Sequence, residues 1–178
     1  AGNVDDDRLS ELTEDETRQE TPNHFIELQA SREREGGLCA KVSLGPNNTV
    51  KIRFIFRQVR NDWQLSAAGE RWHSLPEFLS DRCRDEHLVI VTMPWVPGVR
   101  QLWRQDGKAR NLVDRRKKDG FATCFATLSS WGLAVTALAR GCFGVEAFAK
   151  LWGQTDRWEV RVEDVTSALQ EDQLHAGS

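Results

Sequence analysis

The stretch GFATCFATLSSWGLAVTALA, residues 120–139, contains twenty consecutive residues without a charged side chain. It directly follows the segment 114–119, Asp-Arg-Arg-Lys-Lys-Asp, which contains four consecutive basic residues. A run of this kind is typical of a buried helix in a globular domain or of a short membrane span. Its large side chains fall on one side of a helical projection, with Ala, Ser and Thr opposite. We therefore predict one long buried helix over 120–139 and keep the membrane span as the alternative.

The clearest local pattern upstream is a pair of alternating segments, 38–44 and 49–57. The sequence Gly-Pro-Asn-Asn at 45–48 separates them, so they are expected to form an antiparallel hairpin. In the second segment the apolar side chains share one face. Lys51, Arg53 and Arg57 share the other, which we expect to be exposed to solvent and basic.

Further elements follow from short local signals. The apolar, β-branched segment 87–93 predicts a buried central strand. Ser74, Pro76 and Glu77 form a helix-start sequence with a capping box. Asp106-Gly107 is a favoured turn between two short strands. The expected strands are 24–28, 62–67, 87–93, 158–162 and a hairpin of 99–103 with 109–113; the expected helices are 74–83 and 145–152, with 164–173 as a short acidic helix or tail.

These elements sum to an α+β fold. A mostly antiparallel sheet of five to seven strands would pack on one long buried helix at about 120–139, with smaller helices around it. Residues 1–22 are expected to form an acidic, disordered tail, 23–163 a single domain, and 164–178 an acidic C-terminal helix or tail.

Charge is distributed unevenly, although the net charge is only −3. Residues 1–38 carry eleven acidic and four basic residues, whereas 87–118 carry eight basic and two acidic residues. Local patches rather than net charge set the field that a ligand meets. The sequence is thus compatible with a polyanion ligand, and the acidic head is a candidate intramolecular competitor.

The four cysteines are no closer than 18 residues apart, so they form no zinc-type pair. We predict no metal, no cofactor and no disulfide, and a reducing intracellular compartment, the cytoplasm or nucleus. The acidic N-terminus without an apolar segment indicates no signal peptide.

The basic stretch between residues 100 and 118 is the strongest candidate site. On the expected hairpin, cations lie beside an exposed aromatic side chain, the pattern used on phosphate backbones and stacked bases. The basic face of the first hairpin would extend this patch. The candidate polyanion-binding residues are Arg100, Trp103, Arg104, Lys108, Arg110, Arg115, Arg116, Lys117, Lys118, Lys51, Arg53 and Arg57.

The sequence gives little support for enzymatic activity. His73 stands beside Ser74, but the serine is explained by the helix cap, and the acids near His87 are explained by solvation of a helix end. The sequence contains no GxSxG, HExxH or Gly-rich phosphate loop. We therefore predict a protein without enzymatic activity.

The leading hypothesis is a non-enzymatic intracellular module that binds nucleic acid, RNA or DNA, or another polyanion such as an acidic protein surface. The alternative is a structural or adaptor subunit of a larger assembly, homo-oligomers included, in which Trp95, Trp103 and Trp158 anchor protein contacts. A membrane-associated subunit using 120–139 is the third class, and membrane contact is not expected.

Overall fold

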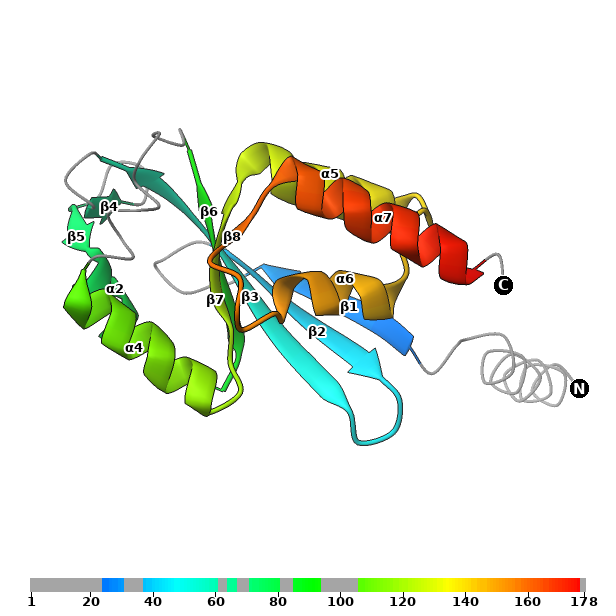
Figure 1. Cartoon of the computed structure of the whole chain (residues 1–178), viewed down its shortest axis with the longest axis horizontal. Helices are drawn as coiled ribbons and strands as arrows, with labels where there is room; N and C mark the ends of the chain where they lie inside the picture. The colour runs from blue at the N-terminus through cyan, green and yellow to red at the C-terminus, as the bar shows by residue number, and fades with distance from the viewer. Residues whose placement is uncertain are drawn as a thin grey trace, which may run out of the picture.

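The computed structural model describes residues 24–30, 37–60, 64–66, 71–80, 85–93 and 106–176. These residues form one eight-stranded mixed sheet and five helices (Figure 1). The strands are β1 (His24–Ala30), β2 (Leu38–Leu44), β3 (Thr49–Val59), β4 (Gln64–Ser66), β5 (His73–Ser74), β6 (His87–Thr92), β7 (Thr123–Thr127) and β8 (Glu159–Val160). The helices are α2 (Leu75–Ser80), α4 (Gly107–Lys118), α5 (Leu128–Ala139), α6 (Val145–Trp152) and α7 (Val162–Ala176).

The sheet is mixed, with four antiparallel and three parallel strand pairings among the described residues. Its order is β1-β2-β3-β6-β7-β8, with β4 and β5 forming a side branch from β3. Strands β1, β2 and β3 pair antiparallel, whereas β3, β6, β7 and β8 pair parallel. The mixed α/β class is thus observed, whereas the expected mostly antiparallel sheet of five to seven strands is matched only loosely, because three of the pairings in this eight-stranded sheet are parallel. The difference arises because helices connect β3 to β6 and β6 to β7, and parallel neighbours require such crossovers.

Helices cover both sides of the sheet, in two groups that lie apart in Figure 1. On one side, here the α4 face, α2 and α4 pack on residues such as Ile55, Ile90 and Phe125. On the other, the α5 face, α5, α6 and α7 pack on residues such as Phe54 and Val91. Five of the six side chains of β6 are buried, as expected for a central parallel strand.

The uncharged run does not form one helix. Residues 123–127 form strand β7 and residues 128–139 form helix α5. The break is a capping box: the Thr127 hydroxyl accepts the backbone N–H of Ser130, and the Ser130 hydroxyl accepts that of Thr127, both at 3.1 Å. The Ser and Thr residues that dilute the run therefore mark the start of α5. Among the described residues, no helix has the length and apolar character needed to cross a membrane.

Several local predictions are confirmed. The β2–β3 hairpin, the buried strand β6 and helix α6 lie where their patterns placed them. Helix α2 begins after Ser74, whose hydroxyl accepts the backbone N–H of Glu77 at 3.3 Å. The described part of α2 ends at Ser80, and residues 81–84 lie outside the described residues.

The hairpin expected at 99–113 is wrong in its second half. Residues 107–118 form helix α4, because Asp106 acts as its N-cap and accepts the backbone N–H groups of Lys108 and Ala109. Residues 99–103 lie outside the described residues. The final strand is also shorter than expected, because Val162 already begins the long helix α7.

His87 gives the fold a specific dependence on pH. Its half-buried ring accepts the backbone N–H of Ala122 through Nδ1 at 2.9 Å, which joins β6 to the start of β7. Burial, and secondarily the positive charge of Arg116, lowers the pKa of His87 below its ordinary value. The folded protein thus resists protonation of His87, whereas the unfolded chain takes up a proton below about pH 6.5.

We predict that this contribution to stability is complete above about pH 6.5 and is lost as the pH falls further. The His87→Asn variant keeps an oxygen acceptor near the Ala122 N–H but does not titrate. Urea unfolding at pH 7.5 and pH 5.5 should therefore show a smaller acid-induced loss in the variant than in the wild type. Equal losses in both proteins would contradict the prediction.

Candidate polyanion-binding surface

Helix α4 has one buried face and one exposed face. The buried face consists of Ala109, Val113 and Arg116, which follow one another at intervals of four and three residues. This face packs toward the sheet and α2. The exposed side carries a stripe at spacings of three, four and three residues. It consists of Lys108, Asn111, Arg115 and Lys118.

Four exposed cations of α4 have no ion-pair partner among the described residues. We call Lys108, Arg110, Arg115 and Lys118 the basic surface. Together they extend over about 15 Å along the helix axis. Lys117 differs from them, because its ammonium pairs with the Asp156 carboxylate at 2.8 Å. This hydrogen bond raises the pKa of Lys117 and lowers that of Asp156.

Helix electrostatics account for only part of this charge. Cations in the last turn, such as Arg115 and Lys118, stabilise a helix through its dipole. Cations in the first turn act against the dipole, and the Asp106 carboxylate at the N-cap supplies the negative charge that offsets them there. Lys108 and Arg110 therefore gain no stabilisation from the helix dipole, and both side chains are exposed.

Arg116, predicted as a ligand contact, is instead a structural residue. It is only 3% exposed, and its guanidinium donates to the Thr123 hydroxyl at 2.8 Å, the Glu86 carbonyl at 2.5 Å and the Ala122 carbonyl at 3.4 Å. These bonds fasten α4 to the start of β6 and β7. Its position in register with Ala109 and Val113 was the sequence signal for burial.

Arg53 and Arg57 do not lie on the exposed basic face of β3 that the sequence predicts. Arg53 is half-buried and donates to the Glu86 carboxylate at 2.6 Å. Arg57 is buried, donates to the Phe56 carbonyl and lies 5.5 Å from the centre of the Phe78 ring. The expectation failed because α2 and α4 cover this face of β3 from Ile55 onward.

Lys51 alone among the three predicted cations of β3 is exposed. It lies opposite exposed Lys41 on β2, where the described residues leave the sheet uncovered. Three predicted site residues, Arg100, Trp103 and Arg104, lie outside the described residues. Of the predicted site, the structure thus places four exposed cations together on α4, whereas Arg53 and Arg116 both bond to Glu86 within the fold.

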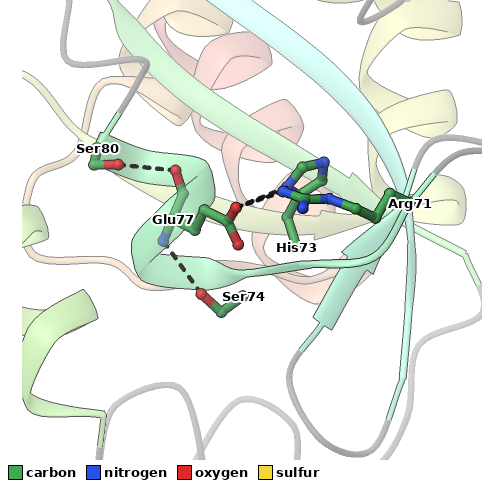
Figure 2. A network of polar contacts seen from close by, with 5 residues as sticks. All are labelled: Arg71, His73, Ser74, Glu77 and Ser80. Atoms are coloured by element: carbon green, nitrogen blue, oxygen red, sulfur yellow. Dashed lines mark hydrogen bonds and ion pairs between the residues drawn. The ribbon is translucent and has the colours of Figure 1, made fainter.

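The polar network around His73 does not form a catalytic triad (Figure 2). The Glu77 carboxylate accepts a hydrogen bond from Arg71 at 2.7 Å and lies 3.4 Å from His73 Nδ1. The hydrogen bond from His73, supported by Arg71, lowers the pKa of Glu77. Ser74 points away from the imidazole and accepts the backbone N–H of Glu77 instead. The network stabilises the start of α2.

The carboxyl ends of β6 and β7 are where an open parallel sheet usually binds a ligand, because the chain leaves them toward opposite faces. Here the hydroxyls are engaged internally: Thr92 donates to the Ala126 carbonyl, and Thr127 and Ser130 bond to each other. On neighbouring β7, burial raises the pKa of the Cys124 thiol to about 12, so it is not a nucleophile near neutral pH. Within the described ranges, no group of three or more His, Cys, Asp and Glu side chains is arranged to hold a metal ion.

Comparison with known proteins gives no relative: no protein-family model, curated protein or solved structure matches the chain. The evidence for function is therefore the geometry and charge of the surface itself.

Adjacent residues Arg115 and Arg116 provide a matched test of this description. Arg116→Gln should lower the free energy of unfolding by about 2–4 kcal/mol, because buried carbonyls lose their charged donor. Arg115→Gln should change it by less than about 0.5 kcal/mol, because the side chain is exposed. Urea denaturation measures both values, and similar effects at the two positions would refute the assignment.

Proposed function

We propose that this protein is a non-enzymatic binding module that contacts a nucleic-acid backbone, or another polyanion, through the basic surface of α4. The observation that carries the proposal is the set of four exposed cations without a described ion-pair partner on one helix. Two of them, Lys108 and Arg110, lie in the first turn, where only the Asp106 carboxylate at the N-cap offsets their charge among the described residues. A row of phosphates would compensate the repulsion among the four cations.

The mode of contact follows from the side-chain types. Arg110 and Arg115 suit bidentate bonds to phosphate oxygens, whereas Lys108 and Lys118 act as compact point charges. Such contacts position a nucleic acid without reading its bases. We therefore expect little sequence preference. Trp103, which lies outside the described residues, remains the predicted base-stacking residue.

A second candidate function is a structural or adaptor subunit of a protein assembly. It is supported by large apolar side chains, Phe25 and Leu28, that are exposed on the terminal strand β1. Trp158 supports it less than the sequence suggested, because its half-buried ring stacks on Phe125 with the centroids 6.2 Å apart.

The salt dependence of binding tests the polyanion proposal. With up to four phosphates neutralised, log K should fall against log salt with a slope of about −3 to −4 on duplex and near −3 on single strands. Fluorescence anisotropy with labelled mixed-sequence oligonucleotides measures this slope. The triple variant Lys108→Gln, Arg115→Gln, Lys118→Gln should lose most of the affinity and reduce the slope by about 2 to 3.

The double variant Lys41→Gln, Lys51→Gln removes charge from the uncovered part of the sheet and is the matched control. It should bind almost as the wild type does. Binding that is insensitive to salt, absent at low salt, or unchanged in the triple variant would contradict the proposal.

The acidic segment 1–22 should compete with the ligand for the basic surface. Its removal is predicted to tighten oligonucleotide binding, most strongly at low salt, where attraction between charges is least screened. The same anisotropy titration measures the change. An unchanged affinity would show that the segment does not compete.

A further inference from the structure

The two terminal strands of the sheet are very different. Strand β8 has only two residues, and charged side chains flank it, with Arg161 bonded to Glu159 at 3.3 Å. Strand β1 has seven residues, pairs with β2 without interruption, and contains no Pro, Lys or Arg. No described residue pairs with its outer side. Natural sheets usually protect an edge by shortening, charge or proline, and β1 has none of these except Glu27.

The exposed side chains of β1 are suited to contact another chain. Phe25 is 52% exposed and Leu28 is 48% exposed, and they project from opposite faces of the strand. Ile26 packs partly against the core on the α5 face. An added strand would therefore gain backbone hydrogen bonds and apolar contacts on both faces.

The pairing of β1 with its inner neighbour β2 shows which side chains fit opposite those of β1. Val42 lies opposite Ile26, Ala40 opposite Leu28, and Lys41 opposite Glu27. A strand added on the outer side of β1 would meet the same three side chains. Cross-strand pairs are stabilising when both side chains are apolar or when they carry opposite charges. The complementary strand thus has an apolar–basic–apolar pattern.

A second copy of the chain fits this edge poorly. In the fully paired antiparallel register of two β1 strands, His24 lies opposite Ala30 and Glu27 lies opposite Glu27. Like charges directly opposite each other destabilise a strand pair. Charge complementarity therefore favours a different chain with a basic residue at the central position.

We infer that β1 is a strand-addition site for a partner protein, whose extended segment places a Lys or Arg beside Glu27 between two apolar residues. The partner extends the sheet by one antiparallel strand. This interaction uses the opposite end of the sheet from β8 and does not depend on the basic surface of α4.

The probe is a fluorescein-labelled seven-residue peptide that copies β2 with Ser in place of Cys39. It should bind the full chain saturably in an anisotropy titration. Methylation of alternate peptide N–H groups on the side facing β1 should abolish binding. Leu28→Lys should weaken binding about tenfold or more, because it removes an apolar contact and places a charge opposite the Ala of the peptide, on its apolar face.

Leu174→Lys is the matched control, because Leu174 is 76% exposed on α7, a helix that packs on α5 and α6. It should leave peptide affinity unchanged. A charge exchange supplies the positive test: Glu27→Lys should reject the Lys peptide and accept a peptide with Glu at that position. Thermal melting verifies that each variant is folded.

Three results would overturn the inference. They are absence of peptide binding, equal effects of Leu28→Lys and Leu174→Lys, and a concentration-dependent dimer in light scattering that Leu28→Lys dissociates. The last result would assign the edge to a second copy of this chain.

Discussion

Burial of strand β6 on both faces is the constraint on which the rest of the structure depends. Its side chains alternate between two cores, with Leu88 and Ile90 toward α2 and α4, and Val89 and Val91 toward α5, α6 and α7. A strand of this kind needs helices on both sides and parallel neighbours reached by crossovers. The two helical layers, the parallel order of β3, β6 and β7, and the division of residues 120–139 all satisfy this requirement.

The same constraint determines which surfaces remain for function. Helices α2 and α4 cover β6, β7 and the part of β3 from Ile55 onward. They leave the corresponding face of β1, β2 and the start of β3 open, as the exposure of Phe25, Lys41 and Lys51 shows. The polar groups at the carboxyl ends of β6 and β7 are used within the fold. Among the described residues, the outer face of α4 and the edge of β1 remain exposed and are the surfaces to which we assign a function.

Sequence patterns that are contained within a few consecutive residues predicted the structure correctly. The β2–β3 hairpin, strand β6, helix α6 and the start of α2 follow from alternation, apolar content or a capping sequence. The failures depended on tertiary contacts. Thr127 and Ser130 fit the middle of a polar-diluted helix as well as a cap, and the burial of Arg57 depends on α2, which packs on β3 from another part of the chain. The helical period of Ala109, Val113 and Arg116 was available in the sequence, but the Asp-Gly turn signal obscured it.

Arg115 and Arg116 show why a basic cluster cannot be interpreted by counting charges. Arg116 fixes the rotation of α4 by bonding to Glu86, Ala122 and Thr123 at the start of the central strands. Since neighbouring residues differ by about 100° around a helix, this rotation directs Arg115 to solvent and aligns it with Lys108 and Lys118. A buried cation thus orients the exposed cations, and one basic sequence serves both the packing of α4 and the presentation of its charged face. Loss of Arg116 should consequently weaken polyanion binding through the position of the helix, whereas loss of Arg115 acts through charge alone.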